Sequence, residues 1–159
     1  MITKVLIVED EEEIREELVE CLTDDGFECV EASDGEEGLN ALRRDKEISV
    51  VLSDINMPSK SGLEMINCAY AEFGKDRDLE YIILTGHGGS TEAIYALKLG
   101  VIEFLAKPSN LNHLIHAVRR AEELVLSKRS RLYYEANLEA EVQANTLEIQ
   151  KLLSNLELA

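Results

Sequence analysis

Residues 4–22 read KVLIVEDEEEIREELVECL, and this stretch combines two kinds of apolar spacing. Residues 5–8 are four successive apolar residues, which is typical of a strand buried on both faces. Further on, Ile14, Leu18 and Leu22 recur every four positions with glutamates between them, as on one face of a helix. A buried strand followed directly by an amphipathic helix predicts the opening of a βαβ unit.

The same alternation continues to about residue 126. Further strands are predicted over four ranges: 27–32, 48–53, 81–85 and 103–106. Helical patterns separate them, and parallel strands joined in this way require right-handed crossovers. We therefore predict a doubly wound α/β fold, a five-stranded parallel sheet with helices on both faces.

Two of the intervening helices open on capping signals. Ser33 followed by Glu36 has the form of a capping box, and so has Ser61 followed by Glu64. In the helix predicted over residues 91–99, we expect Ala93, Ile94 and Leu97 to face the sheet.

The last helix is predicted to start near Asn110 and to continue past the end of the domain. Its later part carries a heptad seam with spacings of 4-3-4-3-4: Leu138, Val142, Asn145, Ile149, Leu152 and Leu156. We divide the chain into a domain over residues 1–124 and a helical extension over 125–159. The extension is interpreted as a coiled coil. It would either form a homodimer or lead to a missing output domain, and in the second case the chain would be a fragment. The alternative is an amphipathic helix that folds back on its own domain.

The charge balance excludes several partners. Lys and Arg number 16 against 32 Asp and Glu, which gives a formal net charge of −16. Such a chain repels phosphate backbones and anionic membrane surfaces, so we expect no direct nucleic-acid or membrane partner. No signal-peptide pattern or long apolar span occurs in the sequence, and we expect a cytoplasmic protein.

Polar residues follow four of the five predicted strands. They are Glu9 and Asp10 after the first strand, Asp54 after the third, Thr85 at the end of the fourth and Lys107 after the fifth. In an open parallel sheet these strand ends meet at one edge. Three carboxylates that close together repel one another by several kcal/mol at an effective dielectric of ~20, so a hard cation such as Mg²⁺ is expected between them. With an ammonium and a hydroxyl nearby, the group suits phosphoryl transfer to Asp54.

These residues lie in four stretches, VLIVEDEEEIREEL (5–18), VVLSDINMPSKSGLEMI (50–66), YIILTGHGG (81–89) and ALKLGVIEFLAKP (96–108). In their order and strand context they resemble the receiver domain of two-component response regulators, over residues 1 to about 124. The resemblance implies the flavodoxin-like strand order 2-1-3-4-5. It also implies a regulator rather than an enzyme, one that takes a phosphoryl group from a sensor histidine kinase or a phosphotransfer protein.

The resemblance also implies a role for each residue of the site. Asp54 would be the phospho-acceptor, and Glu9, Asp10, Asp54 and the Asn56 backbone carbonyl would hold Mg²⁺. Lys107 would pair with the phosphoryl oxygens. Thr85 and Phe104 would be the switch pair, although Phe104 stands where the family more often has a tyrosine.

Three further expectations concern single positions. By the same resemblance, His87 and Asn56 would tune the lifetime of the phosphoryl group, and the Lys107–Pro108 peptide bond would be cis. His113 and His116 are interpreted as surface positions of the last helix rather than as a metal pair.

Two other functions remain open on the sequence. A phosphohydrolase of the haloacid dehalogenase type also attacks phosphate with an aspartate at a strand end, but it needs a second aspartate where this chain has Asn56. The other is a non-catalytic adaptor that uses the coiled coil, with a degenerate acidic site.

Overall fold

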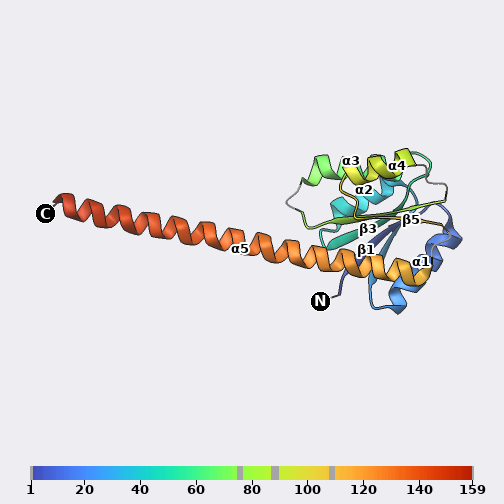
Figure 1. Ribbon diagram of the computed structural model, residues 1–159, viewed down its shortest axis with the longest axis horizontal. Coiled ribbons are helices and arrows are strands. Elements are labelled where there is room, and N and C mark those ends of the chain that lie inside the picture. Colours follow the sequence, from blue (N-terminus) through green and yellow to red (C-terminus); the bar gives the residue numbers. More distant parts are fainter. Residues whose placement is uncertain (1, 75–76, 87–89, 108–109, 159) are drawn as a thin grey trace. The chain divides into compact units, whose positions relative to one another are not determined.

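A computed structural model of the chain describes residues 2–74, 77–86, 90–107 and 110–158. Within these residues, strands and helices alternate along the chain (Figure 1). The strands are β1 (Lys4–Val8), β2 (Glu28–Ala32), β3 (Ile48–Asp54), β4 (Glu80–Thr85) and β5 (Glu103–Ala106). The helices are α1 (Glu12–Asp24), α2 (Gly35–Arg44), α3 (Gly62–Phe73), α4 (Ser90–Lys98) and α5 (Leu111–Leu158).

The strands form a parallel sheet in the order β2-β1-β3-β4-β5, which confirms the predicted doubly wound fold. Every residue of β3, the central strand, is buried. The register places Leu84 of β4 opposite Asp54 of β3, and Ala106 of β5 opposite Thr85 of β4. The strand ends that carry the predicted polar residues therefore meet at one edge of the sheet.

A hydrophobic cluster covers each face of the sheet. On one face, residues such as Leu6 and Ile83 pack with side chains of α2, α3 and α4. On the other face, residues such as Ile7 and Leu52 pack with side chains of α1 and of the first part of α5 (Figure 1). Successive strand residues point to opposite faces, which explains why β1 and β3 need uninterrupted apolar runs.

The helix starts agree with one capping prediction and shift the other. The Ser61 hydroxyl accepts a hydrogen bond from the Glu64 N–H at 3.2 Å, as predicted. For α2, the cap is Asp34 rather than Ser33, and its carboxylate accepts from the Glu37 N–H at 2.8 Å. The Glu37 carboxylate in turn accepts from the Ser33 N–H at 2.7 Å, so the capping pattern lies one residue later than predicted.

The predicted inner face of α4 is wrong for two of its three residues, while Ala93 is half-buried. Ile94 and Leu97 are 54% and 61% exposed, whereas Ala96 is fully buried. Residues 93, 94, 96, 97 and 99 are all apolar, so the sequence of this short helix offers two apolar faces. Ala96 and, in part, Leu99 pack against the hydrophobic cluster of the sheet instead.

The chain divides into two compact units, Met1–Val125 and Leu126–Ala159. The first contains the sheet, helices α1 to α4 and the start of α5, and the second contains the remainder of α5. In the second unit, the described apolar seam residues from Leu138 to Leu156 are all at least 45% exposed. No helix in the described part of the chain is both long enough and apolar enough to cross a membrane.

Candidate functional site

The end of β1 places two acidic residues in different environments. Glu9 follows the last residue of the strand, and its backbone N–H donates to the Ala32 carbonyl at 3.0 Å. Arg15 donates to the Glu9 carbonyl at 2.9 Å, so both peptide groups of Glu9 are held. The Glu9 side chain is 1% exposed, whereas Asp10 lies at the surface.

The end of β3 presents Asp54, whose side chain is only 10% exposed. The Ser53 hydroxyl donates to the Asp54 carbonyl at 2.9 Å. The Gly62 N–H donates to the Ile55 carbonyl at 3.0 Å, which closes the loop over residues 55–61 onto the end of the strand. A Cβ atom on Gly62 would collide with the Asp54 carbonyl oxygen, so glycine is required for this closure.

Lys107, just after β5, reaches both of these strand ends. Its ammonium donates to Glu9 Oε2 at 2.8 Å and lies 3.4 Å from Asp54 Oδ2. Its backbone N–H donates to the Thr85 carbonyl at 2.7 Å, which fixes the start of the side chain beside β4. One cation therefore bridges two carboxylates that come from strands 45 residues apart in the sequence.

Burial and the neighbouring side chains together shift the pKa values of Glu9 and Lys107. Burial raises the pKa of Glu9 and outweighs the hydrogen bond from Lys107, while the charge of Asp54 raises it further. Burial lowers the pKa of Lys107, but the hydrogen bond to Glu9 and the charges of Asp54 and Glu9 together raise it above its usual value. The site thus holds a firmly protonated lysine beside crowded carboxylates.

Two buried oxygen atoms at the site have no hydrogen-bond partner among the described residues. They are Oε1 of Glu9 and Oγ1 of Thr85, a residue that is only 2% exposed. A buried polar atom without a partner costs about 1–3 kcal/mol, so such atoms point to a bound water, a ligand or a second conformation.

The donor set fits a magnesium ion. Carboxylate oxygens of Glu9, Asp10 and Asp54 all lie within 4.8 Å of one another, and no other group of three potential ligands is found in the described part of the chain. An octahedral Mg²⁺ site places neighbouring ligand oxygens about 3 Å apart and opposite ones about 4 Å apart, so small side-chain movements would suffice. The unpartnered Oε1 of Glu9 supplies one oxygen that is already free of competing bonds.

Of the other predicted site residues, the structure describes Asn56 and Phe104. Asn56 is exposed in the loop after β3, two residues beyond Asp54. Phe104 lies on β5, half-buried and packed against the cluster that contains Ile83. His87 and the Lys107–Pro108 bond fall outside the described residues.

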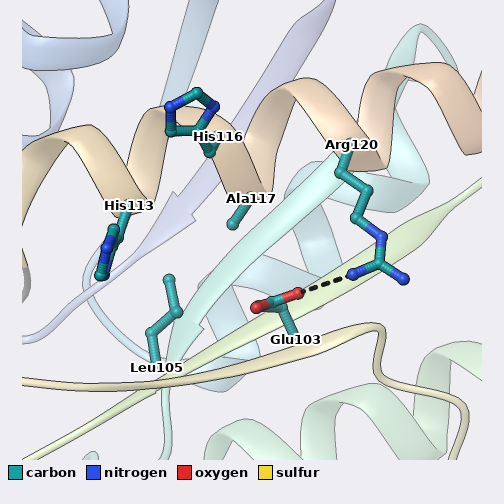
Figure 2. Close-up of a pocket in the computed structure, with 6 residues that line it drawn as sticks. All are labelled: Glu103, Leu105, His113, His116, Ala117 and Arg120. Carbon is teal, nitrogen blue, oxygen red and sulfur yellow. Dashed lines mark ion pairs between the residues drawn. The ribbon is translucent and has the colours of Figure 1, made fainter.

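The two histidines of α5 do not form a site with each other. Figure 2 shows their rings pointing in different directions beside a pocket of about 290 Å³. Leu105, Ala117 and an ion pair between Glu103 and Arg120, 3.6 Å apart, also line this pocket. His113 and His116 are both exposed, in agreement with their interpretation as surface positions.

Sequence reasoning missed two supports of the site. The capping pattern at Ser61 explained the start of α3 but gave no reason for glycine at position 62. The signal was present, because glycine at the first position of a helix is unfavourable and calls for a close approach of other backbone. The contact from Arg15 to the Glu9 carbonyl left no signal among the many charges of α1.

Comparison with known proteins agrees with this geometry. The model of the response regulator receiver domain family matches residues 5–119. The two-component response regulator PprB of Pseudomonas aeruginosa is 33% identical over 118 residues, which are 74% of this chain and 43% of PprB. A CheY homolog, a chemotaxis protein of Campylobacter jejuni, is 37% identical over 106 residues, 66% of this chain and 81% of that protein.

The chain covers less than half of some of these relatives. It spans 43% of PprB and 27% of the C4-dicarboxylate transport transcriptional regulatory protein DctD of Rhizobium meliloti, with which it shares 34% identity over 129 residues. The shared part is therefore one region of those longer proteins.

Solved structures show the same fold. A response regulator receiver protein from Pseudomonas putida has a TM-score of 0.71 at 32% identity, over 76% of this chain and 98% of that one. A receiver domain protein from Clostridium thermocellum has a TM-score of 0.70 at 34% identity, over 76% and 94%. With the parallel sheet, the acidic cluster at its edge and the family match over residues 5–119, the chain belongs to the receiver domain family of two-component response regulators.

Proposed function

We propose that Asp54 accepts a phosphoryl group from a phosphohistidine, and that this modification switches the domain between two states. Receiver domains of this family are phosphorylated by histidine kinases. The observation that carries the assignment to this residue is the Lys107 ammonium, which lies 3.4 Å from Asp54 Oδ2 at the edge of the sheet. The donor would be a sensor histidine kinase or a phosphotransfer protein.

The transfer conserves atoms and charge in one displacement. A carboxylate oxygen of Asp54 attacks the phosphorus atom, and the phosphorus–nitrogen bond of the donor breaks. The donor imidazole leaves with the bonding electron pair and takes up a proton. Lys107 is placed to neutralise the equatorial oxygens of the phosphoryl group, because its ammonium already faces Asp54 and its pKa is raised.

Glu9, Asp10, Asp54 and the backbone carbonyl of Asn56 would hold Mg²⁺. When bound, the ion would neutralise the carboxylates and the incoming phosphoryl oxygens. Asp10 is exposed and suits direct ligation, while Glu9 is buried and has one oxygen without a hydrogen-bond partner among the described residues. Asn56 and His87 are proposed to influence the lifetime of the acyl phosphate through the approach of water.

Thr85 and Phe104 are proposed as the switch pair. The Thr85 hydroxyl is buried without a partner among the described residues, so a new phosphoryl oxygen at Asp54 would offer it a hydrogen bond. Phe104 is half-buried one strand away, packed at the border of the hydrophobic cluster. Movement of Thr85 would leave space for this ring to turn inward and alter the surface around β5.

The helix beyond residue 125 is proposed to pass the switch on. It would act as a linker to an output domain, as a homodimerisation helix, or as both. The support is its continuous helical conformation and its exposed apolar seam. Longer relatives named as transcriptional regulators include the receiver-type region as a part of their length.

Incubation with acetyl phosphate and Mg²⁺ tests the phosphoryl transfer. Intact-mass spectrometry is expected to show one added phosphoryl group per chain, and Asp54→Ala is expected to abolish it. Asp24→Ala, which removes an exposed carboxylate outside the site, is the matched control and is expected to keep full labelling.

Three results would contradict the proposal. Labelling that survives Asp54→Ala would place the acceptor elsewhere. Rapid turnover of many phosphate esters would favour a phosphohydrolase, and the absence of both labelling and turnover would favour a non-catalytic adaptor.

An unchanged rate of phosphate loss in His87→Ala would remove that residue from the assignment.

A further inference from the structure

The second unit of the chain exposes a regular apolar seam on one side of a helix. Its seam positions are Leu138, Val142, Asn145, Ile149, Leu152 and Leu156. The five apolar members are between 45% and 72% exposed, although residues of this size in the first unit are mostly buried. Alternating spacings of four and three residues bring all six onto one side of an α-helix, which is the arrangement of a coiled-coil interface.

We infer that residues 138–156 pair with the same segment of a second copy of this chain as a parallel, in-register, two-stranded coiled coil. Asn145 of each copy then faces Asn145 of the other. The inference rests on the dimerisation part of the proposed function, and it is independent of the phosphoryl transfer to Asp54.

The position of Asn145 favours the parallel arrangement. In a parallel in-register pair each seam residue meets its own counterpart, so the two Asn145 side chains can donate to and accept from each other. An antiparallel pair with the same six positions overlapped instead places Asn145 against Ile149 of the second copy. A polar amide would then be buried against an apolar side chain, with the desolvation cost of an unpaired polar group.

The residues beside the seam favour the same arrangement. Glu141 and Glu148 lie on one flank, and Thr146 and Leu153 lie on the other. In a parallel pair the first flank of one helix meets the second flank of its partner five residues further on. Glu141 then meets Thr146 and Glu148 meets Leu153, so no carboxylate faces another.

The antiparallel arrangement brings like flanks together instead. With the same overlap, Glu148 of one copy meets Glu148 of the other near the twofold axis. Two carboxylates facing each other repel, and the repulsion is stronger next to a desolvated seam. Flank charge and the seam amide therefore both select the parallel pair.

The seam pattern also shows where the interface begins. Continued toward the N-terminus, the seam pattern reaches Glu135 and then Arg131, which would meet their own counterparts in a parallel pair. On its N-terminal side the pairing therefore begins at Leu138, and the seam over residues 138–156 spans fewer than three heptads. A helix pair this short is weak by itself, so the monomer and dimer should exchange with protein concentration.

Disulfide trapping of Leu152→Cys tests the arrangement, because it captures a weak pair. In the parallel pair the two thiols introduced at position 152 face each other within reach of a disulfide. Ser154→Cys is the matched control, since this position lies on the opposite side of the helix and is also exposed. We expect Leu152→Cys to form its self-disulfide on the order of tenfold faster or more than Ser154→Cys in the same redox buffer.

Mass spectrometry identifies which thiols are linked, so the natural Cys21, Cys29 and Cys68 can be retained. It also separates the possible outcomes. A bond between the two thiols introduced at position 152 supports the parallel register. A bond that forms only in a mixture of Leu152→Cys with Val142→Cys would overturn it in favour of the antiparallel pair. Equal rates for Leu152→Cys and Ser154→Cys would also overturn it, especially where sedimentation shows a monomer at every concentration.

The two proposals fail separately in this design. Labelling of Asp54 with acetyl phosphate can be measured on the same samples before oxidation. A chain that is labelled normally but shows no trapped pair loses the coiled-coil inference alone. A chain that is trapped as a pair through position 152 but takes no label loses the phosphoryl transfer alone.

Discussion

Leu52 in β3 and Ile149 in the distal part of α5 show two uses of a large aliphatic side chain. Leu52 is fully buried among residues of its own chain, whereas Ile149 is 57% exposed. Full burial of such a side chain is worth about 1.5–3 kcal/mol, and in the first unit this gain belongs to folding. In the second unit the gain is still available, and a partner helix can supply it.

The difference extends to the charged residues. In the first unit, carboxylates from distant strands are drawn together by folding and held by Lys107. In the second unit, Arg131 pairs with Glu135, one turn further along the same helix, at 3.9 Å. Folding of the first unit holds like-charged side chains close together despite their repulsion. In an isolated helix, the distances between charged side chains are set by their spacing in the sequence.

The largest expected effect separates the two units by their apolar residues. Leu52→Ala should lower the free energy of unfolding of the first unit by about 2–5 kcal/mol, because it leaves a cavity beneath two helices. Ile149→Ala, measured by urea unfolding at low protein concentration, should change it by less than about 0.5 kcal/mol.

Equal losses from the two substitutions would contradict this comparison. A large loss from Ile149→Ala that does not depend on protein concentration would show that the helix folds back onto its own domain. A loss that grows with protein concentration would instead measure pairing between copies.

The contrast also explains what the sequence could and could not predict. The apolar run of residues 5–8 lies within β1, where all four residues are buried, because an apolar run buried on both faces has few alternatives. The range predicted for β5, 103–106, was also confirmed, although its residues are half-buried or exposed. The acidic cluster was predicted from strand order, since parallel strands bring Glu9 and Asp54 to one edge.

The failures have a common cause. Ile94 and Leu97 of α4 were placed inward because a short helix with two apolar faces satisfies the helical period in either orientation. The unpartnered oxygens of Glu9 and Thr85 depend on distances between side chains, which no spacing rule contains. Local pattern therefore predicts which elements form, and the packing of neighbours decides which faces and atoms are covered.

Mg²⁺ should produce a smaller effect, confined to the first unit. At an ion concentration tenfold above the dissociation constant, binding to the folded state stabilises it by about 1.4 kcal/mol. The melting temperature of the first unit should rise by a few degrees and fall again on chelation. Asp10→Asn removes an exposed carboxylate of the cluster and should abolish the response. A response that persists in this variant would place the ion elsewhere.

The smallest effect concerns two ion pairs, one in each unit. Lys4 Nζ lies 2.7 Å from Asp45 Oδ2, with side chains 17% and 27% exposed, whereas the Arg131 and Glu135 side chains are 65% and 61% exposed. The hydrogen bond from Lys4 lowers the pKa of Asp45 below its usual value. Because the folded state holds the proton less tightly, this pair stabilises the chain above the unfolded-state pKa of about 4 and loses that contribution as the pH falls through the folded-state pKa.

Asp45→Asn should therefore cost at most about 1 kcal/mol at neutral pH, and the difference from the natural chain should shrink in acid. Glu135→Gln should not measurably change the free energy of unfolding at any pH, since solvent screens both charges of the Arg131–Glu135 pair. Urea unfolding of the two variants at neutral and acidic pH measures both effects. If the two variants lost the same free energy of unfolding, the Arg131–Glu135 pair would not be weakened by solvent. The distal helix would then be covered by protein even at low protein concentration.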